Sequence, residues 1–81
     1  MEKRVRKKAI PQEVIDLGLK IREIMNEKGF KTRDVAYESD MDVENFRKYL
    51  NGRQEMKVST MLKIANALKV TVGELFDQEL K

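Results

Sequence analysis

Three carboxylates at alternate positions, Asp40, Asp42 and Glu44, have the spacing that comes closest to a known chemical site. Alternating oxygen ligands open a calcium-binding loop. Such a loop needs glycine at its sixth position and glutamate at its twelfth, and these positions hold Asn45 and Asn51. The sequence therefore predicts no metal site.

Catalytic chemistry is not indicated either. The 81 residues include no histidine and no cysteine, which removes the usual general base, the usual metal ligand and any disulfide. No combination of nucleophile, base and oxyanion donors can be recognised. We expect a protein that is not an enzyme and needs no cofactor, and no small-molecule substrate is evident.

The positive charge is concentrated at the N-terminus. The net charge of the chain is +3, while residues 1–8 alone carry +4, from Lys3, Arg4, Arg6, Lys7 and Lys8 against one glutamate. We expect residues 1–10 to form a flexible basic arm and residues 11–81 one domain. No apolar run approaches the ~18 residues of a membrane span, and the signal-peptide pattern is missing, so we expect a cytoplasmic protein.

Apolar residues at three- and four-residue spacings predict five helices and no strand, an all-α class. The first helix begins with Pro11 at its first position and ends at Gly29. The second covers residues 32–38, and the third follows Asp42 as N-cap and ends at Asn51–Gly52. The inward faces expected for the first, third and fourth helices are Val14, Leu17, Ile21, Ile24 and Met25; Phe46, Tyr49 and Leu50; and Val58, Met61, Leu62, Ala65 and Leu68.

A capping box, in which a threonine and a glutamate bond each other's backbone N–H groups, opens the short fifth helix at Thr71 and Glu74. This helix carries Leu75 and Phe76. Gly18, inside the first helix, costs up to about 1 kcal/mol relative to alanine unless packing requires it.

Residues 32–51 have the spacing of a helix-turn-helix unit, whose second helix can enter the major groove of DNA. Ala36 supplies the small residue needed where the two helices cross. Asp40 lies in the turn, where a residue that tolerates positive φ is needed. The whole forms a compact five-helix domain.

Over residues 17–76 the chain resembles the lambda-repressor and Cro-like helix-turn-helix domains of the XRE family. The matching segments are Leu17-Gly18-x-x-Ile21-Arg22-x-x-Met25-x-x-Lys28-Gly29, Thr32-x-x-Val35-Ala36, Met41-Asp42, Asn51-Gly52-Arg53, and Val58 through Phe76. The chain departs from the family at three positions: Asp40 replaces the turn glycine, and Lys31 and Lys57 replace serine or threonine N-caps.

The resemblance implies that the start of the third helix reaches base edges, through Val43, Glu44, Asn45, Arg47 and Lys48. Asn45 can pair with adenine, Lys48 with guanine, and Glu44 with the amino group of cytosine, although a carboxylate near phosphates is repelled unless it has a partner. The side chains expected at phosphates are Lys31, Thr32, Asn51, Arg53 and Lys57. The arm has two open alternatives, a DNA contact and a solubilising tail.

The function predicted is sequence-specific binding of double-stranded DNA by a transcriptional regulator that acts as a repressor. The family resemblance implies a homodimer on a roughly palindromic site. Leu75, Phe76 and Leu80 are candidates for the dimer contact, or they close the core, which is favoured for Phe76. The alternative is a protein-interaction module of the same fold, an anti-repressor or antitoxin subunit, which the acidic residues at 40, 42 and 44 favour. Membrane-surface binding through residues 1–8 is a weaker third hypothesis.

Overall fold

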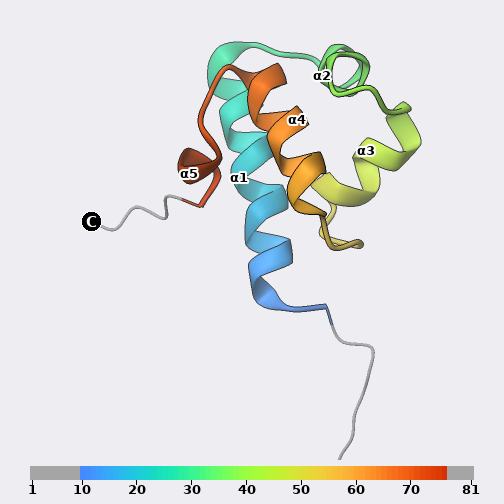
Figure 1. The fold of residues 1–81 in the computed structure, drawn as a ribbon, viewed down its shortest axis with the longest axis vertical. Coiled ribbons are helices and arrows are strands. Elements are labelled where there is room, and N and C mark those ends of the chain that lie inside the picture. The colour runs from blue at the N-terminus through green and yellow to red at the C-terminus, as the bar shows by residue number, and fades with distance from the viewer. Residues whose placement is uncertain (1–9, 77–81) are drawn as a thin grey trace, which may run out of the picture.

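Five helices account for most of the computed structural model, which describes residues 10–76 (Figure 1). They are α1 (Gln12–Lys28), α2 (Thr32–Glu38), α3 (Val43–Leu50), α4 (Val58–Leu68) and α5 (Val72–Leu75). No strand occurs between residues 10 and 76. The all-α, five-helix prediction is confirmed, including the bounds of the second and third helices.

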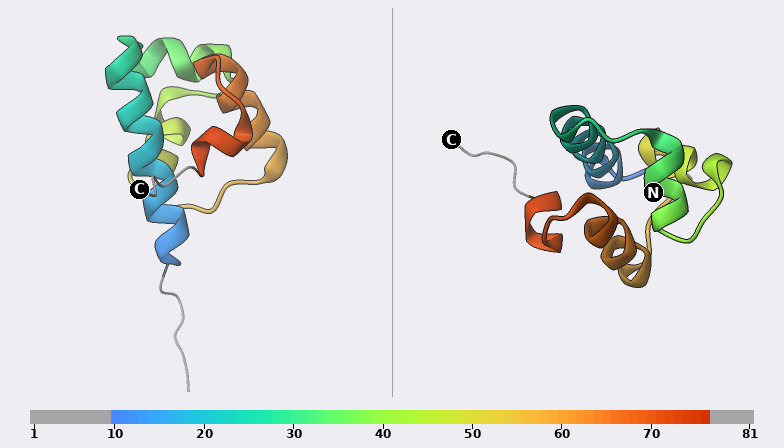
Figure 2. Two further views of the ribbon diagram at one scale, coloured as in Figure 1. Left: turned by 90° about the vertical axis from the view of Figure 1, so that its left-hand side faces the viewer. Right: turned by 90° about the horizontal axis from the view of Figure 1, so that it is seen from above.

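The longest helix, α1, runs along one side of the domain (Figure 2). It contacts α3 on one side and α5 on another, while α4 contacts α2 and α5 (Figures 1 and 2). The short pair α2 and α3 also contact each other, so α3 is held between α1 and α2. The remaining face of α3 is exposed on the outside of the molecule.

The predicted helix ends are formed largely by local hydrogen bonds. The Asp42 carboxylate accepts the Asn45 N–H at 2.7 Å, and Thr71 and Glu74 form the expected capping box. Gly29 ends α1 in the left-handed conformation, with φ +73°. One end differs from the prediction, because Pro11 has ψ 145° and is the N-cap of α1 rather than its first residue.

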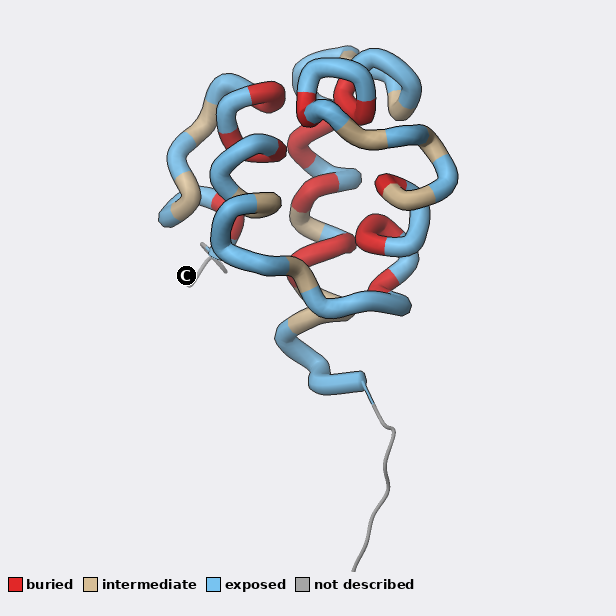
Figure 3. The backbone as a smooth tube through the Cα atoms, turned by 45° about the vertical axis from the view of Figure 1, so that its right-hand side comes forward, coloured by how far each residue is buried: buried red, intermediate tan, exposed pale blue. Residues whose placement is uncertain are grey.

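The core lies between the inner faces of the five helices (Figure 3). The inward faces predicted for α1 and α3 are confirmed, except that Val14 is only half-buried. The largest fully buried side chains are those of Phe46, Ile21, Ile64, Leu68 and Leu75. They come from four helices, so a single small core holds these helices together.

The predicted inward face of α4 is partly wrong. Val58 and Leu62 are 68% and 51% exposed, while Ile64 is fully buried. Apolar residues cover a wide arc of α4, so three- and four-residue spacing fits two overlapping faces. Packing against α2 and α5 selects the face that contains Ile64, Ala65 and Leu68.

The end of α5 also needs a correction. Leu75 is fully buried and closes the core, so it is not available for a dimer contact. Phe76, which was expected to close the core, is 44% exposed. The two residues are adjacent, and once Leu75 enters the core its neighbour is rotated away from it. Leu80 lies outside the described residues.

The turn between α2 and α3 has the backbone predicted for it. Asp40 adopts φ +61°, which glycine would adopt without steric cost. Its neighbour Ser39 is completely buried, and within residues 10–76 the Ser39 hydroxyl has no hydrogen-bond partner. A buried hydroxyl without a partner costs free energy, so the turn contains a local weakness.

Candidate nucleic-acid interface

The outer face of α3 is a continuous polar stripe. Its members Glu44, Arg47 and Lys48 are exposed, and so is Asn51, which is the C-cap of the helix. They occupy positions i, i+3, i+4 and i+7, which coincide on one side of an α-helix. We call these four residues the α3 stripe. The opposite face is buried in the core, so the stripe is the surface that α3 can offer to a partner.

Val43 and Asn45 are placed differently from the rest of the predicted base-reading set. Both are half-buried at the first turn of α3, and Val43 packs against the core. The backbone N–H of Asn45 is occupied by the Asp42 cap. Five residues are predicted to read bases. Glu44, Arg47 and Lys48 lie on the α3 stripe, whereas Val43 and Asn45 lie at the edge of the stripe.

The carboxylate that conflicts with DNA binding has a partner. Glu44 and Arg47 lie one helical turn apart, and a side-chain oxygen of Glu44 is 3.6 Å from a guanidinium nitrogen of Arg47. Both side chains are largely exposed, so the pair contributes little stability. Its relevance is electrostatic, because it reduces the negative potential that Glu44 would present to a phosphate.

The residues predicted to contact phosphates lie at helix ends. Lys31 is the N-cap of α2 and Lys57 that of α4, and neither side chain caps its helix. Thr32 is the half-buried first residue of α2, and Arg53 is exposed just beyond α3. The replacement of serine or threonine by Lys31 and Lys57 therefore leaves α2 and α4 without a side-chain N-cap, as the sequence predicts. The first turn of α4 contains no acidic residue, so no carboxylate of that turn offsets the positive end of the helix dipole.

Asn51 is joined to a residue that the sequence does not place in the site. Arg22, on α1, donates from Nη2 to Oδ1 of Asn51 at 2.6 Å. The two residues are 29 positions apart in sequence. Spacing along one helix cannot reveal a contact of this kind, and only the crossing of α1 and α3 creates it.

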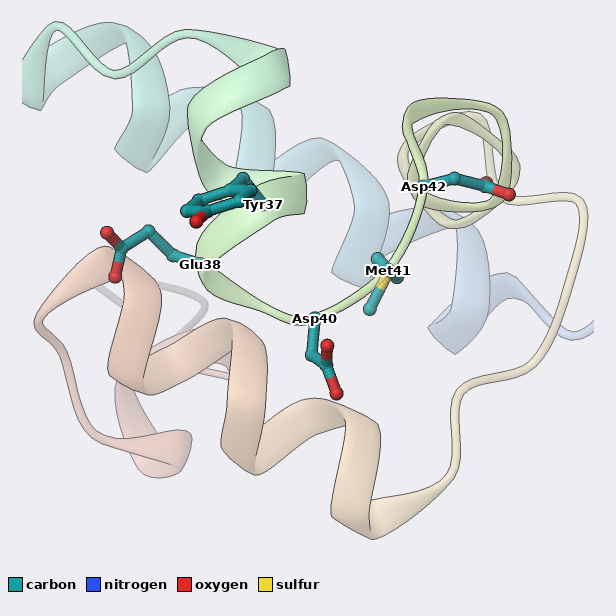
Figure 4. A pocket seen from close by; sticks show the side chains of 5 residues that line it. All are labelled: Tyr37, Glu38, Asp40, Met41 and Asp42. Atoms are coloured by element: carbon teal, nitrogen blue, oxygen red, sulfur yellow. The ribbon is translucent and has the colours of Figure 1, made fainter.

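A second surface adjoins the start of α3 and is acidic. Tyr37, Glu38, Asp40, Met41 and Asp42 line an open hollow at the end of α2 and along the turn (Figure 4). Tyr37 is 83% exposed, which is unusual for an aromatic side chain. Asp40 points toward α4, where Lys63 lies 4.0 Å from its carboxylate.

Several other predictions concern features that the structure tests only within residues 10–76. The arm residues Lys3, Arg4, Arg6, Lys7 and Lys8 lie outside this range. Within it, no three histidine, cysteine, aspartate or glutamate side chains gather closely enough to hold a metal ion. In the same range no helix has the length and apolar character needed to cross a membrane.

Comparisons with known proteins agree with this geometry. The model of the Cro/C1-type HTH DNA-binding domain matches residues 20–80. The restriction-modification controller protein C.AhdI from Aeromonas hydrophila has a similar structure, with 26% sequence identity and a TM-score of 0.78, over 82% of this chain and 100% of that one. No curated protein matches the chain.

Two further solved structures share the fold at lower identity. The clp gene regulator ClgR from Corynebacterium glutamicum is 21% identical with a TM-score of 0.78, over 88% of this chain and 99% of that one. A hypothetical transcription factor, NHTF from Neisseria, is 22% identical with a TM-score of 0.73, over 91% of this chain and 88% of that one.

The chain belongs to the Cro/C1-type helix-turn-helix DNA-binding domain family, as its resemblance to these domains predicts. Its expected partner is thus double-stranded DNA, and the comparisons support transcription regulation through DNA binding. The family is one of DNA-binding domains of the transcription-regulator type.

Proposed function

We propose that this protein is a sequence-specific transcriptional repressor that inserts α3 into the major groove of its operator. The observation that carries the proposal is the α3 stripe, a polar face on a short helix whose other face is fixed in the core. A helix held in this way presents its hydrogen-bonding groups at fixed positions, which direct readout of base edges requires.

The chemistry of the first two turns of α3 defines the bases that it would read. Lys48 donates to the acceptors of guanine, Asn45 pairs with adenine, and Val43 contacts a thymine methyl group. Glu44 accepts from the amino group of cytosine, and Arg47 screens it from the nearest phosphates. Lys31, Thr32, Asn51, Arg53 and Lys57 fix the register by binding phosphates.

Selection of bound sequences from a random duplex library tests this function directly. We expect enrichment of a short motif, which appears twice in inverted orientation if the protein binds as a homodimer. Loss of all binding to random duplex DNA, even at low salt, would contradict the proposal, because phosphate contacts alone give measurable non-specific affinity.

Replacement of one stripe residue distinguishes base reading from phosphate binding. Lys48→Ala is expected to cost about 1–3 kcal/mol of binding to the selected sequence and less to random duplex DNA, because base contacts contribute only at the right sequence. Equal losses on the two duplexes would remove Lys48 from the base-reading set. Lys63→Ala, on α4, removes the same charge and serves as the control.

The basic arm is proposed as a second DNA contact. Its five cations are enough to follow a backbone or enter a minor groove. Deletion of residues 2–8 is expected to flatten the dependence of DNA affinity on salt, since fewer counterions are released. An unchanged slope would leave the arm as a solubilising tail.

The acidic hollow favours a second candidate function. Tyr37, Glu38, Asp40 and Asp42 form an exposed surface with an aromatic side chain, which suits a protein partner with basic residues. In this alternative the domain is a protein-interaction module, such as an anti-repressor or antitoxin subunit. It gains support if the protein fails to bind random duplex DNA at low salt.

A further inference from the structure

The Arg22–Asn51 contact joins two elements at the end of the α3 stripe. Asn51 is the last member of the stripe, and the Arg22 guanidinium reaches it from α1 at 2.6 Å. Both residues are exposed. The polar surface of α3 therefore continues onto α1 at this point.

The chemistry of the two side chains fixes their orientation. Arginine has five N–H donors and no acceptor, so the side-chain oxygen of Asn51 must face it. The amide NH₂ group of Asn51 is then turned away from Arg22, and it can only donate. With the Asn51 oxygen already accepting from Arg22, the pair offers mainly N–H donors and one positive charge to the solvent.

The surroundings of the pair have the same character. No carboxylate of residues 10–76 lies within 4.0 Å of the Arg22 guanidinium, whereas Arg47 on the same stripe is paired with Glu44. Arg53, two residues beyond Asn51, is exposed. The matching ligand is an anion that accepts several hydrogen bonds, as a phosphate oxygen does.

We propose that Arg22 and Asn51 together hold one phosphate of the DNA backbone, which makes α1 a DNA-contacting element. The proposal rests on the proposed DNA binding. Arg22 supplies the charge, and the hydrogen bond to its guanidinium keeps the Asn51 amide in position to donate. The contact fixes the end of α3 on the duplex without reading a base.

A structural role for the pair makes a different prediction. The C-terminus of α3 is the negative end of its dipole, so a cation beside it stabilises the helix even without DNA. Such a role changes protein stability but leaves the number of phosphates neutralised unchanged. The salt dependence of binding therefore separates the two roles.

The test is the slope of log affinity against log salt, measured with the full chain on its selected duplex and on random duplex DNA. Arg22→Gln removes the charge but keeps a hydrogen-bonding amide. We expect the slope to fall by about 0.9, the value for one phosphate, on both duplexes. Lys28→Ala, at the C-terminal end of α1, removes the same charge and is expected to leave the slope unchanged.

Asn51→Ala tests the coupling within the pair. It is expected to weaken DNA binding about fivefold in the wild-type background and less in the Arg22→Gln background, because the two groups share one phosphate. Thermal unfolding of each variant verifies that it is folded. If Arg22→Gln does not fold, Arg22→Lys replaces it, with an expected slope equal to that of the wild type and weaker binding.

The outcomes separate this proposal from the function on which it rests. If the wild type binds DNA and Arg22→Gln keeps the wild-type slope, the phosphate contact is wrong while DNA binding stands. If Lys28→Ala lowers the salt slope as much as Arg22→Gln does, the change reflects the net charge of the protein, and the proposed phosphate contact is also wrong. Absence of wild-type binding contradicts both proposals together.

Discussion

The two ends of α3 are held by different kinds of interaction. The N-terminal end is fixed by residues close in sequence, namely the Asp42 cap and the turn at Asp40. The C-terminal end is fixed by α1, through the Arg22–Asn51 hydrogen bond and two glycine contacts at positions 18 and 52. The end expected to approach bases is therefore locally determined, and the other end depends on tertiary packing.

This difference predicts how each end tolerates substitution. Local caps and turns usually contribute about 1 kcal/mol each, so their loss weakens the domain without changing its fold. Close backbone contact between two helices leaves no room for an added carbon atom. We therefore expect the C-terminal end to be the more sensitive of the two.

Gly18→Ala is expected to have the largest effect. The added Cβ would lie 2.6 Å from the carbonyl oxygens of Tyr49 and Leu50, so α1 and α3 must separate. We predict a loss of about 2–3 kcal/mol in the free energy of unfolding, measured by denaturant titration, despite the higher helix propensity of alanine.

Gly73→Ala is the matched control, because the added Cβ would have only ordinary contact, at 3.7 Å from the Thr71 hydroxyl. This change is expected to be neutral or stabilising by up to about 1 kcal/mol. If the two variants lost similar amounts of unfolding free energy, close packing between α1 and α3 would not make the C-terminal end of α3 more sensitive to substitution than the N-terminal end.

Asp42→Ala tests the N-terminal end. It removes the carboxylate that accepts the Asn45 N–H, and we expect a loss of about 1 kcal/mol in unfolding free energy. Asp42→Ser should restore most of this loss, since serine is also a good N-cap. A loss as large as that of Gly18→Ala would show that Asp42 does more than cap α3.

Ser39→Ala is expected to stabilise the same end. The buried hydroxyl has no partner in the described part of the chain, so its removal relieves a desolvation cost and should raise the unfolding free energy by about 1 kcal/mol. Ser59→Ala, at an exposed position of α4, controls for the general effect of this substitution. A lower stability of Ser39→Ala would indicate that the hydroxyl is hydrogen-bonded in solution.

Asp40→Gly should have the smallest effect. Glycine adopts φ +61° without steric cost, but it also gains freedom in the unfolded chain, so we expect a stabilisation of about 0.5 kcal/mol or less. The ion pair with Lys63 is exposed and contributes little. A loss above about 1 kcal/mol would assign the Asp40 side chain a role in the turn.

Much of the site follows from periodicity and from the family resemblance. The bounds of α2 and α3, the Asp42 cap and the positive φ of Asp40 are all predicted from local residue types. The positive φ of Lys69 at the end of α4 is not, because no glycine or asparagine marks that position.

The sequence by itself determined where most of the helices begin and end, including both ends of α2 and α3, because caps, turns and apolar spacing act over a few residues. Only the tertiary structure decided which face of α4 is buried, that Leu75 rather than Phe76 closes the core, and that Gly18 is required where α1 meets α3. It also decided the contact between Arg22 and Asn51. These features depend on which helices pack together, and no pattern within a single helix contains that information.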